Sequence, residues 1–226
     1  MSMRYRKQVF CGALVVGLFL GIAASARAQT CSTTITGGTY TDLLVPADAT
    51  CTLQCVTVTG NIVVQSGATL IAESNCETQS SVGGNVITVD AACVFLPTNA
   101  TGAIGGNVIA IGTDAQSGSK CNVLCPTKVS GNVAILGSPS GSQPWGFCSE
   151  AGFTVGGNFE FANNGTSATI ESETIHGNLL FDNNTDGGLI FANTIGGNLQ
   201  CSGNTGSLTG SGNTVSGAKL EQCSTF

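Results

Sequence analysis

A short motif recurs along most of this 226-residue chain: an aliphatic residue, a small residue, the pair Gly-Asn, and then an alternating apolar strand. Successive copies begin 20 to 26 residues apart, and from Val155 onward the spacing is a constant 20 residues. A period of this length is typical of one turn of a β-solenoid, in which each turn can bury its apolar face only against its neighbours. The repeat therefore predicts an all-β, single-domain, parallel β-helix of about eight coils.

The Gly-Asn pair predicts a corner at which each coil turns. Glycine reaches positive φ without strain and asparagine tolerates it, so the pair suits a sharp change of direction. Asparagines on stacked coils can also hydrogen-bond to one another as a ladder. A ligand-binding array is the alternative, but a structural corner is the better interpretation. The asparagines assigned to this corner are Asn61, Asn85, Asn107, Asn132, Asn158, Asn178 and Asn198.

Strand alternation predicts which side chains face the core of the coils. Residues two apart on a strand share a face. In the strict repeats, we expect Phe159 and Phe161 to point inward, together with Leu179 and Phe181 on the next coil. Glu160 between the two phenylalanines should point outward.

Residues 1–28 have the features of a signal peptide. A positive start at Arg4, Arg6 and Lys7 precedes an apolar run, and the triplet 26–28 (Ala-Arg-Ala) matches a cleavage site. The run is shorter than the roughly 20 residues of a membrane span, so a membrane anchor is the less favoured alternative. We expect an exported protein, in the extracellular space, at the cell surface or in the periplasm. Residues 29–57 should then form an N-terminal cap with a first irregular coil, and residues 58–226 the β-helix with a C-terminal cap.

Charge excludes one class of partner. Without the signal peptide the chain keeps three lysines and no arginine against 13 acidic residues, a formal charge of −10. Binding to phosphate groups depends on clustered lysine and arginine. Nucleic acids and anionic lipid surfaces are therefore excluded as partners.

Ten cysteines remain after residue 28, and an even number in an exported chain indicates up to five disulfides. Spacing relative to the repeat favours Cys201–Cys223 and Cys121–Cys148, because each pair would lie on neighbouring coils. The other six cysteines allow 15 connectivities, which stay open. A zinc site is the alternative, but the chain has a single histidine. We expect no metal and no cofactor.

The C-terminal repeats carry a family resemblance. The segments 196–205 and 212–219, followed by Cys223, resemble secreted bacterial Gly-Asn-repeat proteins that are predicted to form a right-handed parallel β-helix. The resemblance covers residues 35–226, and more distantly the repeat is similar to the pectate-lyase-like superfamily. It implies the fold and export, but no particular activity.

The distant resemblance raises an enzyme alternative, because that superfamily contains polysaccharide lyases and glycosidases. The candidate groups would be Asp182, Asp186 and His176, with Glu171 and Glu173 on the coil before. Paired carboxylates can act on a glycosidic bond. However, His176 occupies the variable small position of the repeat, and the two aspartates align with small or polar residues elsewhere. We therefore assign no catalytic residue and keep a polysaccharide-active enzyme as the alternative.

The longest coil predicts a contact surface. Its extra residues lie in the loop 137–148, which holds Trp145 and Phe147. Binding residues often lie on loops that interrupt a regular scaffold, and an indole ring can stack on a sugar or anchor a protein. The alternative is that Trp145 folds back onto its own coil. The function predicted from the sequence is a secreted or cell-surface structural or interaction protein, a disulfide-bonded rod that presents loops to a glycan or an extracellular protein.

Overall fold

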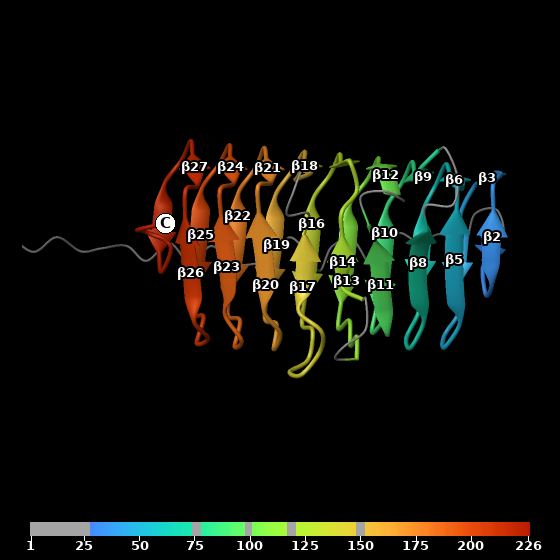
Figure 1. The fold of residues 1–226 in the computed structure, drawn as a ribbon, viewed down its shortest axis with the longest axis horizontal. Helices are drawn as coiled ribbons and strands as arrows, with labels where there is room; N and C mark the ends of the chain where they lie inside the picture. Colours follow the sequence, from blue (N-terminus) through green and yellow to red (C-terminus); the bar gives the residue numbers. More distant parts are fainter. Residues whose placement is uncertain (1–27, 74–77, 98–100, 117–120, 148–151) are drawn as a thin grey trace, which may run out of the picture.

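The chain forms a long rod of stacked coils (Figure 1). In this computed structural model the described residues are 28–73, 78–97, 101–116, 121–147 and 152–226. Within these ranges every regular element is a β-strand, and every strand pairing is parallel. The strands build about nine turns, close to the eight predicted. The all-β parallel β-helix predicted from the repeat is confirmed.

Three sheets run the length of the rod, and every third strand returns to the same sheet. Sheet A has ten strands: β1 (Gln29–Thr30), β4 (Leu43–Val45), β7 (Ile62–Val64), β10 (Val86–Val89), β13 (Val108–Ile111), β16 (Val133–Leu136), β19 (Phe159–Ala162), β22 (Leu179–Asp182), β25 (Leu199–Ser202) and β28 (Lys219–Glu221). Sheet B has nine strands: β2 (Thr34–Thr36), β5 (Thr50–Gln54), β8 (Thr69–Glu73), β11 (Cys93–Leu96), β14 (Val123–Leu124), β17 (Trp145–Phe147), β20 (Ala168–Glu171), β23 (Gly188–Phe191) and β26 (Leu208–Ser211). Sheet C also has nine: β3 (Thr39–Tyr40), β6 (Thr57–Val58), β9 (Ser80–Val82), β12 (Thr101–Ile104), β15 (Lys128–Val129), β18 (Thr154–Val155), β21 (Thr174–Ile175), β24 (Thr194–Ile195) and β27 (Thr214–Val215).

The N-terminal segment is described only from residue 28 onward. Of the predicted signal peptide, residues 1–28, only Ala28 lies within the described residues. Residues 29–57, predicted as a cap with an irregular coil, supply strands to all three sheets. In the described part of the chain, no helix is long and apolar enough to cross a membrane.

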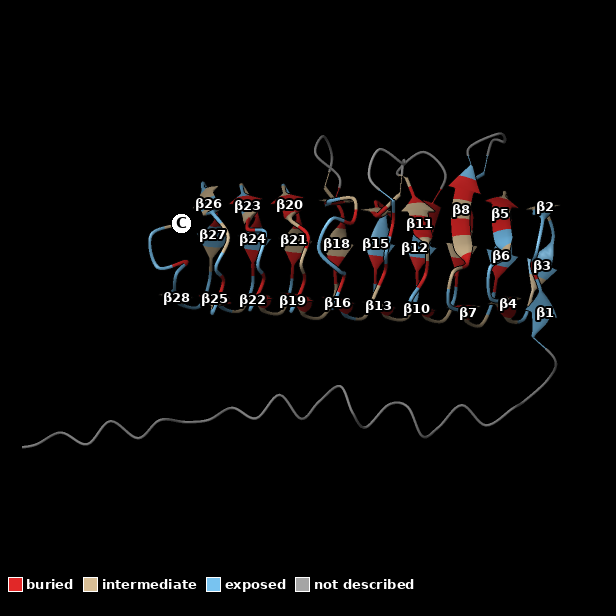
Figure 2. Ribbon diagram, turned by 90° about the horizontal axis from the view of Figure 1, so that it is seen from below, coloured by how far each residue is buried: buried red, intermediate tan, exposed pale blue. Residues whose placement is uncertain are grey.

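The core is a column of inward side chains between the three sheets. In Figure 2 buried residues, in red, recur in one coil after another along the rod. Phe159, Phe161, Leu179 and Phe181 are fully buried, as the alternation predicts, and Glu160 between them lies on the outer surface, half-buried. The rings of Phe161 and Phe181 stack with centroids 5.1 Å apart. Identical register on neighbouring coils thus places like side chains directly above one another.

The Gly-Asn corner exists, but positive φ is not the reason for its glycines. None of the seven corner asparagines or their preceding glycines has positive φ. A Cβ added to Gly84 would instead lie 2.6 Å from the carbonyl oxygen of Gly60 and 2.7 Å from Oδ1 of Asn61. Glycine is needed because the preceding coil approaches the backbone too closely for any side chain. The expected conformational reason was wrong, and a steric one replaces it.

Positive φ occurs instead at other turns, most regularly where the chain leaves sheet A. From β4 to β28, each of the nine strands of sheet A ends in, or is shortly followed by, a residue with positive φ, and glycine, asparagine or aspartate holds all but the last of these positions, where Glu221 stands. These residue types tolerate the left-handed region best. The residues are Asp48, Gly67, Asp90, Gly112, Gly137, Asn163, Asn183, Gly203 and Glu221.

The corner asparagines form the predicted ladder. The backbone N–H of each one donates to the side-chain oxygen of the residue one coil earlier, at 2.7 to 2.9 Å. The first acceptor is Oδ1 of Asp42, and Oδ1 of Asn198 accepts the last bond, from the N–H of Ala218. The ladder therefore extends along nearly the whole rod.

Two further ladders lie inside the C-terminal half. Asn164, Asn184 and Asn204 are buried and stack in the turn between sheets A and B, where Oε1 of Gln222 ends the series. The other ladder joins Asn193 and Asn213 in the turn between sheets B and C. The backbone N–H groups of the inner ladders donate toward the C-terminus, whereas those of the corner ladder donate toward the N-terminus.

Three disulfides join neighbouring coils among the described residues. The predicted bond Cys201–Cys223 is confirmed, with Cα atoms 5.3 Å apart, and Cys31–Cys51 resolves one connectivity that the sequence left open. The predicted bond Cys121–Cys148 is wrong, because Cys121 is bonded to Cys93. The pairing of Phe95 with Val123 brings positions 93 and 121 into register on adjacent coils. Cys148 itself lies outside the described residues.

Candidate functional site

The predicted contact residues Trp145 and Phe147 are not on the surface. They are only 1% and 5% exposed, because strand β17 turns both side chains inward and Gly146 outward. The indole Nε1 donates to Oγ of Ser138 at 3.1 Å, and the ring of Phe147 meets that of Phe159 edge to face at 4.9 Å. The assignment of these two residues to a binding surface was therefore wrong. They are core residues, which agrees with the alternative in which Trp145 folds back onto its coil.

The groups considered for catalysis are distributed around the coil rather than gathered. Asp182 is half-buried on the outer face of sheet A, and Glu171 lies on the outer face of sheet B. His176 is exposed at the corner between sheets C and A, and Asp186 is exposed in the turn between sheets A and B. Glu173 is buried in the turn between sheets B and C, where its carboxylate accepts from the N–H of Phe153. This set does not form a common site.

Two carboxylates on sheet A are nevertheless perturbed. The pKa of Glu160 is raised by burial and, to a lesser extent, by the negative charge of Asp182. Burial also raises the pKa of Asp182, and the charge of Glu221 adds to this. Hydrogen bonds from the N–H and Oγ of Ser202, at 2.8 and 2.9 Å, act in the opposite direction. Perturbed pKa values occur in structural networks as well as in active sites, so they do not assign a reaction.

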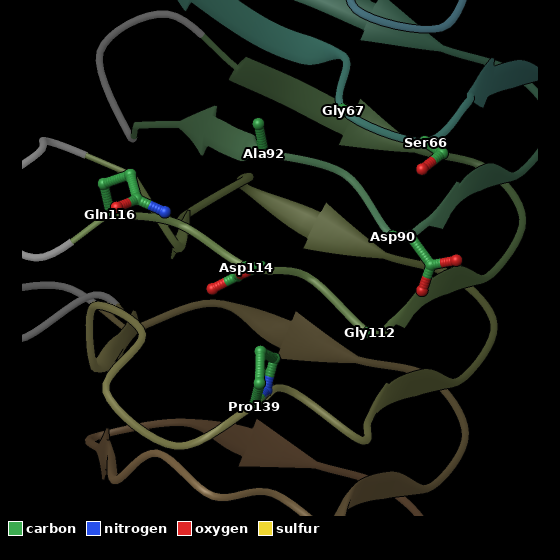
Figure 3. A pocket seen from close by; sticks show the side chains of 8 residues that line it. All are labelled: Ser66, Gly67, Asp90, Ala92, Gly112, Asp114, Gln116 and Pro139. Carbon is green, nitrogen blue, oxygen red and sulfur yellow. The ribbon is translucent and has the colours of Figure 1, made fainter.

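Figure 3 shows a shallow hollow of about 410 Å³ over the turns between sheets A and B. Two carboxylates, Asp90 and Asp114, line it together with Gln116 and Ser66. Asp114 also accepts a hydrogen bond from Oγ of Ser142 at 2.9 Å. The described residues contain no group of three or more His, Cys, Asp or Glu side chains that could hold a metal ion. The hollow offers oxygen atoms to a ligand, but no built metal centre within the described part of the chain.

A continuous apolar surface forms the outer face of sheet A in the N-terminal half. In strands β4 to β16 every outward side chain is apolar, and all are half-buried. In-register pairing places them in rows along the rod. We call this surface the aliphatic face; it consists of Leu44, Val63, Ile87, Val89, Ile109, Ile111, Ala134 and Leu136. No other described element covers it along the lower side of the rod in Figure 2.

A second, smaller apolar feature lies on the outer face of sheet B. Leu189 and Phe191 are the large hydrophobic side chains with the highest exposure in the described chain, at 36% and 39%. Both belong to strand β23, whose inward residue Ile190 is fully buried. Their neighbours on the strands either side are polar: Thr169 and Thr209 beside Leu189, and Glu171 and Ser211 beside Phe191.

Both surfaces had a signal in the sequence that composition alone does not reveal. Strands such as 86–89 and 108–111 are apolar at nearly every position, so a period of two leaves aliphatic residues on the outside as well. In the segment 188–191 the inward position is Ile190, which turns Leu189 and Phe191 outward for the same reason.

Comparison with models of known protein families, with curated proteins and with solved structures finds no match to this chain.

Proposed function

We propose that this chain is an exported interaction protein, a rigid β-solenoid rod that binds an extracellular protein partner through its aliphatic face. The observation that carries the proposal is the uncharged row of aliphatic side chains from Leu44 to Leu136 on sheet A. Large contiguous apolar patches on soluble proteins mark interaction sites, because leaving them in water is unfavourable.

The dimensions of the aliphatic face suit a protein partner. Five strands at a spacing of about 4.8 Å extend over roughly 20 Å, and side chains at the edges widen the patch further. On the same sheet the face ends toward the C-terminus at Glu160 and Asp182, which supply a polar border. An apolar centre with a polar rim is the usual anatomy of a protein interface.

The rod itself supports a scaffolding role. Asparagine ladders and three disulfides tie each coil to the next, so the rows of outward side chains keep a fixed spacing. A surface that is already ordered loses little conformational entropy when a partner binds. Disulfides between coils are also what an oxidising compartment permits, which supports export.

A cross-linking experiment tests the proposal. A photoreactive amino acid replaces Ile109 in the full-length chain expressed in its source organism, and a matched variant carries it at Thr194, an exposed residue of sheet C. The supporting result is an adduct with one extracellular protein, identified by mass spectrometry, at Ile109 but not at Thr194, together with an exported chain that begins at Gln29. Equal labelling at both positions, or retention of residues 1–28 in the cytoplasm, would contradict it.

A further inference from the structure

We propose that Leu189 and Phe191 form a binding platform for an uncharged β-1,4-linked glycan on the outer face of sheet B, separate from the aliphatic face. The two side chains are 36% and 39% exposed, in adjacent outward positions of strand β23. The two residues form a distinct apolar site, because most other outward residues of this half of the rod are polar. We call this pair the β23 platform.

The exposed area argues for a small ligand rather than a protein. With about 200 Å² for a whole side chain, the two residues leave roughly 150 Å² of apolar surface in water. A stable protein interface needs about 800 Å² on each partner, several times more than this pair offers. An area of this size corresponds to the apolar face of one or two sugar rings.

The polar residues around the platform fit a glycan. Thr169 and Thr209 flank Leu189, while Glu171 and Ser211 flank Phe191, each on the neighbouring strand. Within the described chain the side-chain oxygens of these four residues make no hydrogen bond to other protein groups, so they remain able to bind hydroxyl groups. Apolar contact surfaces combined with a few placed polar groups are typical of small-molecule sites.

Charge and shape select the kind of glycan. The chain has a net charge of −6, and Glu171 borders the platform, so an anionic polysaccharide would be repelled. The outward side chains of β20, β23 and β26 form one regular sheet face, because the three strands pair in register. A β-1,4-linked chain of pyranose rings is an extended ribbon with C–H groups on both faces, and such a ribbon can lie flat against Phe191.

Titration with cellohexaose and chitohexaose, followed by NMR chemical-shift changes, tests the platform. We expect shifts at residues of β20, β23 and β26, and Phe191→Ala should weaken binding by about tenfold or more. Glu171→Gln should weaken it severalfold, and Phe191→Trp should retain it. Phe95→Ala is the matched control, because Phe95 is a half-buried phenylalanine on the same outer face of sheet B, four coils away; it should bind as the unaltered protein does.

Two results would overturn the proposal: no shifts with either sugar at about 10 mM, a concentration at which even millimolar binding is visible, or unchanged binding by Phe191→Ala. A thermal melt of Phe191→Ala, expected to match the unaltered protein because the ring is exposed, separates loss of binding from unfolding. Ile109→Asp on the aliphatic face should leave the sugar titration unchanged, so the outcome is independent of the protein partner proposed above.

Discussion

Asn178 donates two hydrogen bonds to one atom of Asn158: its backbone N–H and its Nδ2 lie 2.8 and 3.1 Å from the Oδ1 of that residue. The two residues are one coil apart, and Gly177 N–H bonds to the carbonyl of Gly157 beside them. Each corner thus fixes the next one through the backbone and the side chain together. The corner therefore links neighbouring coils by hydrogen bonds in addition to turning the chain.

Gly177→Ala should be strongly destabilising. The new Cβ would lie 2.5 Å from Oδ1 of Asn158 and 2.7 Å from the carbonyl oxygen of Gly157, so the two stacked corners would have to move apart. We expect a loss of about 2–4 kcal/mol in the free energy of unfolding, measured by denaturant titration. Gly146→Ala is the control, because a Cβ there meets no atom within 4 Å. Equal stability of both variants would contradict the steric account of the corner.

Asn184→Ala should cost more than Asn198→Ala. Asn184 is buried, and its Oδ1 accepts from the N–H and Nδ2 of Asn164. In the variant the N–H of Asn164 would lose its acceptor, and its Nδ2 would keep only the carbonyl of Ile135. The Nδ2 of Asn184 also bonds to the carbonyl of Phe161 at 2.9 Å. A buried donor without an acceptor costs about 1–3 kcal/mol, whereas water can replace the lost bonds at the exposed Asn198. Thermal melts of the two variants measure the difference, and a smaller effect at Asn184 would refute it.

Trp145→Ala should unfold or severely weaken the rod. The side chain is 1% exposed and among the largest in the core, so its removal leaves a cavity and an orphaned Ser138 Oγ. Truncation of a buried aromatic residue costs about 3–5 kcal/mol. Trp145→Phe should lose less, since it keeps most of the apolar volume. A Trp145→Ala variant with an unchanged melting temperature would place the indole outside the core.

Glu160→Gln should stabilise the protein at neutral pH but not in acid. Burial, with the charge of Asp182, raises the pKa of Glu160, so folding favours its protonated form. The stability from this group is fully present below its ordinary pKa of 4.5 and is lost as the pH rises through the folded-state value. The melting temperatures of both proteins should therefore coincide near pH 3.5 and separate toward pH 7, with the variant higher. A lower melting temperature of the variant than of the unaltered protein at pH 7 would contradict this prediction.

Much of the fold could be predicted from short segments. The repeat period, the direction of stacking and the inward positions of Phe159, Phe161 and Phe181 all follow from local alternation and spacing. These properties are local because each coil contacts only its two neighbours. The candidate surfaces were harder to predict from the sequence, because the role of Leu189 or Ile109 depends on which residues of the neighbouring strands lie beside them.

The sequence by itself determined the coil, its parallel stacking and the Asn ladder, because a repeated 20-residue unit brings like groups into contact without any long-range choice. Only the tertiary structure decided that Trp145 is a core residue, that Cys121 pairs with Cys93, and that the corner glycines relieve a clash. The register of an irregular coil is set by the strand on either side: Val123 fixes Gly146 outward and therefore Trp145 inward. Which residues of such a strand face inward depends on the neighbouring coil, so the local sequence pattern does not determine it.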